Sequence, residues 1–185
     1  SHPDYLDSLA LQPTLNRTVL PFYFEKASQI PSGWRLNFKN PRQRNAYGQL
    51  GLAYSVVKGE KIGDTGFVAG EYFQKHEDKS IKGGKGMNKK VDVSEVEVVR
   101  ERDNKRVRLL VGQKNTPIDV EATLVYTRLE TRQFNVVPGD EFELNGAKYK
   151  VKEIKETKNQ SAKGAAIVLV ELATGGERTL TALEQ

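Results

Sequence analysis

The stretch Tyr54-Ser55-Val56-Val57-Lys58-Gly59-Glu60 returns 80 positions later as Phe134-Asn135-Val136-Val137-Pro138-Gly139-Asp140. Each copy has an aromatic residue, a polar residue, two valines and a Gly-acid pair, which is typical of a strand that runs into a tight turn. A strand-and-turn segment used twice predicts one small β unit present in two copies. We expect these copies to set the architecture of the chain.

The composition is that of a globular protein. The chain has 185 residues, 37% of them hydrophobic and 29% charged, which leaves room for one sizeable domain or two small ones. No apolar run approaches the roughly 20 residues that a membrane-spanning helix requires. The absence of cysteine excludes disulfides, thiolate zinc sites and cysteine nucleophiles.

Charge is distributed unevenly along the chain. Residues 1–115 hold 20 Lys and Arg against 13 Asp and Glu, whereas residues 116–185 hold 9 against 11. This asymmetry favours an anionic partner for the first part or head-to-tail self-association. The alternative is an ordinary solubilising surface.

The first part of the chain predicts an arm followed by strands. Residues 4–12 have the apolar spacing of a short helix, and the aromatic run at 19–24 suits an edge strand or an arm that covers the first unit. Apolar alternation predicts strands over 34–39 and 50–56. The lysine-rich segment 75–90 is expected to be a mobile loop.

Alternation resumes after that loop. A change of phase near Ser94 predicts a bulge, and the turn signal Asp103-Asn104 predicts a hairpin. In the second unit, residues 118–126 are the clearest strand, and Asn145-Gly146 is a strong hairpin signal. The strand at 166–172 aligns with the earlier hairpin at an offset of 71 positions.

The expected fold is therefore all-β. It consists of two related small β units, arranged as an antiparallel sandwich or as small barrels, with an N-terminal arm and a short helix. The predicted division is residues 1–33 for the helix and arm, 34–115 for the first unit with its loop at 75–90, and 116–185 for the second unit.

The last part of the chain resembles a known pattern. Gly139-Asp140-Glu141-Phe142, then residues 149–154 and 168–180, is similar to the small periplasmic β domains of pilus-assembly and type II secretion proteins. The chain as a whole resembles small extracytoplasmic proteins encoded with pilus-type genes in Akkermansia-like verrucomicrobia. The resemblance implies a periplasmic or outer-membrane component without enzymatic activity. The hydrophobic anchor helix that begins many pilus proteins is not found in this sequence.

The residues offer little for catalysis or metal binding. His76 stands apart from other ligand types, and Glu95 with Glu97 falls on one strand face, where carboxylates usually solvate a sheet. Gly83-Gly84-Lys85-Gly86 lacks the Ser or Thr and the following helix of a phosphate-binding loop. We therefore expect no catalytic residues, no cofactor and no metal.

The leading hypothesis is a non-enzymatic structural or adaptor component of an extracytoplasmic pilus-like assembly. It would act by protein-protein contacts, in the periplasm, outer membrane or cell surface, with other envelope proteins or in a cyclic homo-oligomer. Membrane contact would need a leader or anchor, and nucleic acid is not the expected partner. Basic loop residues and the valine-rich hairpin supply the predicted partner-binding residues, namely Lys82, Lys85, Lys89, Lys90, Arg42, Arg44, Val96, Val98, Val107 and Leu109.

The alternative hypothesis is a small β-barrel that binds single-stranded nucleic acid, since such folds combine basic grooves with exposed aromatic residues. Its candidates combine basic residues and aromatics of the first unit, namely Arg42, Arg44, Tyr47, Tyr72, Phe73, Lys85, Lys89 and Lys90. A carbohydrate-binding or carbohydrate-active domain is a third class, since β-sandwiches host both.

Overall fold

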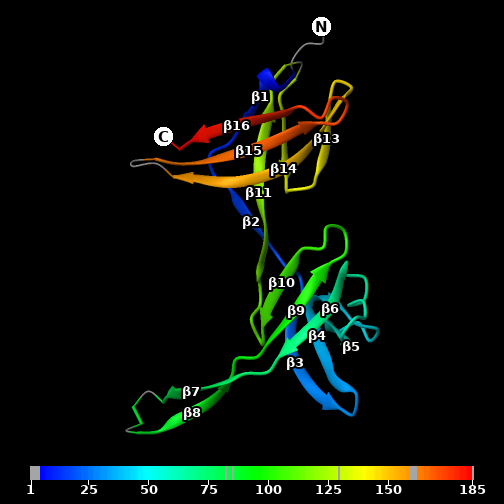
Figure 1. Cartoon of the computed structure of the whole chain (residues 1–185), viewed down its shortest axis with the longest axis vertical. Coiled ribbons are helices and arrows are strands. Elements are labelled where there is room, and N and C mark those ends of the chain that lie inside the picture. Colours follow the sequence, from blue (N-terminus) through cyan, green and yellow to red (C-terminus); the bar gives the residue numbers. More distant parts are fainter. Residues whose placement is uncertain (1–4, 82, 85, 129, 159–161, 185) are drawn as a thin grey trace. The chain divides into compact units, whose positions relative to one another are not determined.

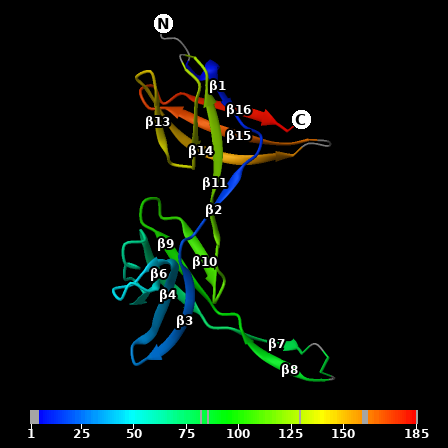
Figure 2. The ribbon, with the colours of Figure 1, turned by 180° about the vertical axis from the view of Figure 1, so that it is seen from behind.

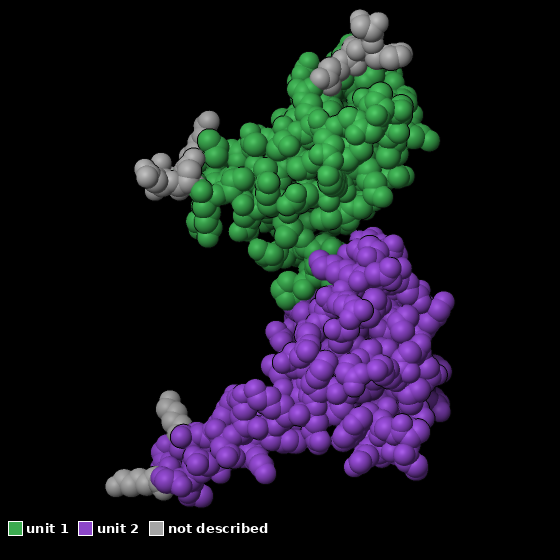
Figure 3. All heavy atoms as spheres, viewed as in Figure 1, with its two compact units in different colours: residues 1–18, 117–185 green, residues 19–116 purple. Residues whose placement is uncertain are grey.

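The computed structural model describes residues 5–81, 83–84, 86–128, 130–158 and 162–184. Its regular structure is antiparallel β-strand apart from one 3-10 turn, which confirms the all-β prediction. The described sheets are open and do not close into barrels. The chain divides into unit 1, residues 1–18 and 117–185, and unit 2, residues 19–116, coloured separately in Figure 3.

Unit 1 is assembled from both ends of the chain (Figure 1). Its elements are η1 (Tyr5–Ser8), β1 (Leu9–Leu11), β2 (Asn16–Val19), β11 (Pro117–Tyr126), β12 (Arg132–Val136), β13 (Glu141–Leu144), β14 (Ala147–Lys158), β15 (Lys163–Glu171) and β16 (Glu177–Leu183). One sheet has the order β1-β11-β12, with β2 also paired to β11, and the other has the order β13-β14-β15-β16. Apolar side chains from both sheets form one buried cluster.

Unit 2 has two three-stranded sheets and one separate ribbon. Its elements are β3 (Tyr23–Ile30), β4 (Gly33–Arg44), β5 (Leu50–Val57), β6 (Phe67–Phe73), β7 (His76–Ser80), β8 (Asn88–Asp92), β9 (Glu95–Arg100) and β10 (Arg106–Leu110). The sheets have the orders β3-β4-β5 and β10-β9-β6, and β7 pairs with β8. Phe22, Phe24 and Phe38 are among the most buried side chains, and their rings lie in contact.

The first copy of the repeated segment forms a capped turn at the end of β5. Glu60 N donates to Val57 O at 3.1 Å, and Val57 N donates back to Glu60 Oε1 at 2.8 Å. Gly59 has φ 91°, a left-handed conformation that costs glycine little. Its N–H donates to Ala69 O on β6 at 2.8 Å, so the turn joins the two sheets of unit 2.

The second copy repeats this arrangement bond for bond. Asp140 N donates to Val137 O at 3.1 Å, and Val137 N donates to Asp140 Oδ2 at 2.9 Å. Gly139 has φ 93°, and its N–H donates to Val151 O on β14 at 2.8 Å. The two turns are therefore equivalent in sequence, backbone conformation and hydrogen bonding.

The returning hairpins match as well. Leu109 pairs with Val96 in unit 2, and Leu180 pairs with Ile167 in unit 1, which is the predicted offset of 71 positions. The strand pairs β4–β5 and β11–β12, and β6–β9 and β14–β15, also correspond in order and direction. The prediction of two related β units is confirmed.

The two copies differ in how their first strands are connected. β3 and β4 of unit 2 are joined by a two-residue turn, whereas the corresponding strands β1 and β11 of unit 1 are separated by the whole of unit 2. The ends of unit 2 meet where Leu20 N donates to Thr116 O at 2.8 Å. One copy is therefore inserted into a hairpin loop of the other, a place where chains tolerate insertions.

This nesting differs from the division expected from the sequence. Residues 5–18 belong to unit 1 and not to a separate segment 1–33. Residues 23–30 form β3, an edge strand of unit 2, so of the two alternatives for the aromatic run the edge strand is confirmed for residues 23 and 24 and the arm is wrong. The expected helix over 4–12 is a 3-10 turn followed by β1, as far as those residues are described. β1 has three residues, and its partner lies more than a hundred residues away, so local alternation could not identify it.

Candidate interaction surfaces

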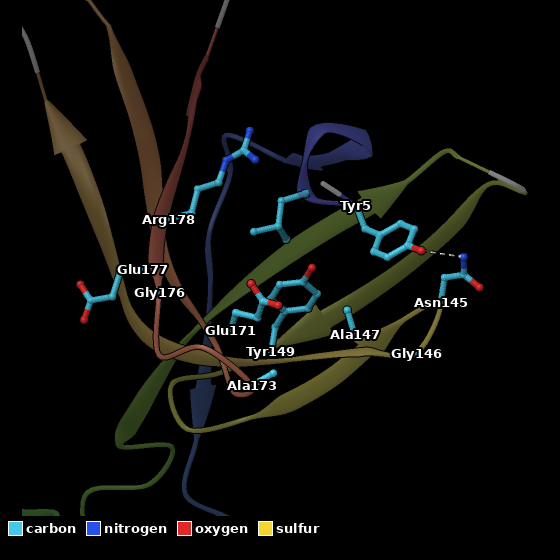
Figure 4. A pocket seen from close by; sticks show the side chains of 11 residues that line it. Tyr5, Asn145, Gly146, Ala147, Tyr149, Glu171, Ala173, Gly176, Glu177 and Arg178 are labelled. Carbon is cyan, nitrogen blue, oxygen red and sulfur yellow. Dashed lines mark hydrogen bonds between the residues drawn. The ribbon is translucent and has the colours of Figure 1, made fainter. Parts of the chain in front are cut away.

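A groove of about 560 Å³ lies at one end of unit 1. It is bounded by η1, the β13–β14 turn and the β15–β16 turn, as Figure 4 shows. The lining residues include the rings of Tyr5 and Tyr149 and the side chains of Glu171 and Arg178. The groove therefore combines aromatic surface with charges of both signs.

Two contacts hold η1 against the strands around this groove. Asn145 Nδ2 donates to the Tyr5 hydroxyl oxygen at 3.2 Å, and Arg178 Nη2 donates to Asp7 Oδ1 at 2.5 Å. The Arg128 guanidinium lies 4.9 Å from the centre of the Tyr5 ring. Asn145 and Arg178 thus hold η1 against the rest of unit 1.

Unit 2 has a hollow at the equivalent place. It is lined by Thr65, Gly66 and residues 100–102, and Arg100 occupies the position that Glu171 has in unit 1. Arg100 is 8% exposed and donates two hydrogen bonds to Asp103, at 3.0 and 2.8 Å. These bonds lower the pKa of Asp103 from its ordinary 3.8 to about 2. In unit 2, then, an ion pair stabilises this end of the fold.

The β7–β8 ribbon extends away from the other strands of unit 2 (Figures 1 and 2). Its strand residues are all exposed except the half-buried Val91. The sequence predicted a mobile loop over 75–90, and this is wrong for the residues described as β7 and β8. The prediction failed because neither face of the ribbon is apolar, so no alternating pattern marks it.

Ser94 attaches this ribbon to unit 2. It is fully buried, its hydroxyl accepts from Lys75 N at 2.9 Å, and it donates to Lys75 O at 3.3 Å. Ser94 N also donates to Asp92 Oδ1 at 2.9 Å, and hydrogen bonds from Ser94 lower the pKa of Asp92. Sequence analysis marked Ser94 only as a bulge position, because a buried hydroxyl leaves no pattern in the sequence.

The structure places the predicted partner-binding residues in different environments. Val96, Val98 and Leu109 are at most 1% exposed and belong to the core, so their side chains cannot contact a partner. That prediction is wrong because the apolar face of this hairpin turns inward, as alternation in a half-buried strand requires. Val107 is half-buried on the edge strand β10.

The basic candidates lie on two separate elements. Arg42 and Arg44 are exposed at the end of β4, and Lys89 and Lys90 are exposed on β8. Lys82 and Lys85 lie outside the described residues. The described basic candidates therefore form two separate pairs, one on β4 and one on β8, and not one continuous basic patch.

No group of three or more metal-ligand side chains occurs among the residues that the structure describes. Within the same residues, no helix is long and apolar enough to cross a membrane. Comparisons with protein-family models, curated proteins and solved structures found no significant match.

Proposed function

We propose that this chain is a structural or adaptor component of an extracytoplasmic, pilus-like assembly, which works without catalysis by binding other polypeptides. The observation that carries the proposal is the β7–β8 ribbon. Two strands leave unit 2 with both faces and both outer edges uncovered by any other described element. Such an element adds little to the core from which it projects.

The ribbon is poorly suited to stand alone. An isolated two-stranded hairpin is marginally stable in water. Lys79 lies directly opposite Lys89, and like charges in such a pair are destabilising. Ile81 and Met87, beyond the ends of the strands, are 39% and 60% exposed. A bound polypeptide strand would pair with an open edge of this ribbon and cover these side chains.

The two units carry opposite net charge, which supports a second copy of the chain among the partners. Unit 2 holds 19 Lys and Arg against 11 Asp and Glu, whereas unit 1 holds 10 against 13. The resulting charges of +8 and −3 favour contact between the basic unit of one molecule and the acidic unit of another. The assignment to an envelope assembly is supported by the sequence resemblance of residues 139–180.

A shortened ribbon tests the proposal. Replacing residues 77–91 by a short Gly-Ser turn should leave the melting temperature nearly unchanged, because the residues of β7 and β8 are exposed apart from the half-buried Val91. Light scattering over a concentration series should show association of the full chain and its loss in the shortened variant. Hydrogen exchange should show protection of the β7 and β8 amides that increases with concentration.

A second variant separates main-chain pairing from charge attraction. The double variant Lys79→Gln, Lys89→Gln keeps every backbone group of the ribbon. It should preserve or strengthen association, since it removes the repulsion between two positive charges that lie opposite each other. A full-length chain that stays monomeric at all concentrations, with ribbon amides that never gain protection, would count against the proposal.

A further inference from the structure

A long stretch of unit 2 carries only positive charge. Between Glu25 and Glu60 there is no Asp or Glu, while six basic residues occur there. These are Lys26, Arg35, Lys39, Arg42, Arg44 and Lys58. The stretch covers β4, β5 and most of β3. Nearly the whole of this sheet therefore carries basic side chains and no carboxylates.

Strand register places several of these side chains on the same face. Lys26 is opposite Asn37, Arg35 is opposite Ser28, and Lys39 lies two residues beyond Asn37 on β4. The alternate residues of β4, such as Phe38, are buried in the core, so the basic set faces outward. Among the described residues, no ion pair involves the three cations of this face.

The second sheet of the same unit is different. On β10, Arg106 lies 3.4 Å from Glu97 and Arg108 lies 3.9 Å from Glu95, both on the neighbouring strand β9. This sheet balances its charges within itself. Unit 2 therefore has one neutralised sheet and one basic sheet, a contrast that solubility alone does not explain.

The β4–β5 hairpin ends in a well-ordered tip that exposes an aromatic ring. Asn45 Oδ1 accepts from Tyr47 N at 2.9 Å and from Gln49 N at 3.0 Å, and Arg44 Nη1 donates to Gly48 O at 2.7 Å. These bonds fix the backbone, while the Tyr47 side chain is 89% exposed. Leu50 beside the tip is 60% exposed.

We propose that the outer face of the β3-β4-β5 sheet and the β4–β5 tip bind single-stranded nucleic acid. The outward cations contact phosphates, and the Tyr47 ring stacks on a base, which is how sheet surfaces hold single strands without sequence preference. Small polar residues between the cations, such as Ser28 and Asn37, let the strand approach the sheet. The surface is separate from the β7–β8 ribbon and does not depend on its role.

The structure narrows the set of aromatic residues that could take part. Tyr72 packs against Trp34, with ring centres 4.7 Å apart, and Phe73 lies beneath the Arg108 guanidinium at 3.7 Å. Both are only partly exposed and already have partners. Tyr47 is therefore the aromatic residue that stacks on a base, and the basic residues of the sheet contact the phosphates.

Binding of a labelled oligodeoxythymidine to the full-length chain, followed by fluorescence anisotropy over a salt series, tests the proposal. The triple variant Lys26→Gln, Arg35→Gln, Lys39→Gln should weaken binding and lower the salt slope by roughly 0.7 for each lost phosphate contact. The matched control Lys105→Gln, Arg106→Gln, Arg108→Gln removes the same charge from β10 and the residue before it, and should bind as the wild type does.

Variants of the tip test the stacking step. Tyr47→Ala should weaken binding by about five- to a hundredfold with no change in salt slope, and Tyr47→Phe should restore it. Equal losses in the two triple variants would overturn the proposal, because binding would then follow net charge. A second result would also overturn the proposal. In it, inorganic polyphosphate, dextran sulfate or duplex DNA binds as tightly as the oligonucleotide, and the Tyr47→Ala variant binds as the wild type does. The shortened-ribbon variant should keep nucleic-acid binding intact.

Discussion

Ser94 shows how a single small side chain determines the position of a whole element. Its hydroxyl donates to and accepts from the backbone of Lys75, on the segment that leads into β7. Its own N–H donates to Asp92 at the end of β8. The buried serine thus fixes both strands of the ribbon where they leave the core.

Ser94→Ala removes an acceptor from the buried end of the ribbon. Because Lys75 N–H then lacks its partner, the free energy of unfolding should fall by about 1–3 kcal/mol. Urea denaturation measures this, and hydrogen exchange of Lys75 should become faster. The control Ser55→Ala changes an exposed hydroxyl 3.5 Å from Arg35 and should alter stability by less than about 0.5 kcal/mol. Equal effects of the two substitutions would contradict the assigned role.

The Arg100–Asp103 pair predicts a pH dependence with a definite sign. The pKa of Asp103 is lowered from 3.8 to about 2, so the pair contributes stability above the ordinary pKa and loses it as the pH falls toward 2. The difference in melting temperature between wild type and Asp103→Asn should therefore be largest above about pH 4 and shrink on acidification. A difference that stays constant from neutral to acidic pH would show that protonation of Asp103 is not involved.

At the scale of elements, apolar alternation identified the strands that have one buried face. The expected strands at 34–39, 50–56 and 118–126 lie within observed strands, and the expected strand at 166–172 coincides with β15 as far as Glu171. β7 and β8 were missed because they have no buried face, and β1 because it is too short. The difference in charge between the β3-β4-β5 sheet and the β10-β9-β6 sheet also depends on strand register. Counting charged residues along the sequence gives no information on register.

Gly164 predicts a steric test of the β15–β16 pairing. A Cβ built at this position would lie 2.2 Å from Ala182 O, which is backbone and cannot move aside cheaply. Gly164→Ala should therefore destabilise unit 1 by about 1–3 kcal/mol. Gly176→Ala is the control, because its nearest neighbour is the Thr174 hydroxyl at 3.3 Å. Thermal unfolding of both variants measures the difference, and a Gly164→Ala protein as stable as the control would contradict the observed pairing.

At the scale of the molecule, the sequence predicted the duplication and the change of unit near residue 116, and it missed the nesting. The repeated turns are local, so their residues are visible in the sequence. The pairing of β1 with β11 joins residues far apart in the chain, and alternation carries no information on such a contact. Residues 5–18 were therefore predicted to lie in a separate N-terminal segment, whereas they belong to unit 1.

The nested arrangement predicts that the inner unit is autonomous and the outer unit is not. Residues 19–116 expressed alone should fold, since both sheets and the core of unit 2 come from this segment. Residues 117–185 alone should not, because they lack Leu6, Leu9 and Leu11, which are buried in the unit 1 core. Circular dichroism and amide chemical-shift dispersion distinguish the outcomes. Folding of 117–185 without residues 1–18 would contradict the assignment of the N-terminal segment to this core.

The hairpin interrupted by unit 2 also imposes an order on biogenesis. β1 leaves the ribosome before unit 2, and its partner β11 follows only after about a hundred further residues have been made. During that interval unit 2 can complete its sheets. Leu9 and Leu11 of β1 cannot yet be buried, because the rest of the unit 1 core has not been synthesised. A nascent chain from which unit 2 has emerged but β11 has not would therefore present a folded unit 2 together with the exposed leucines of β1, the kind of surface that chaperones recognise.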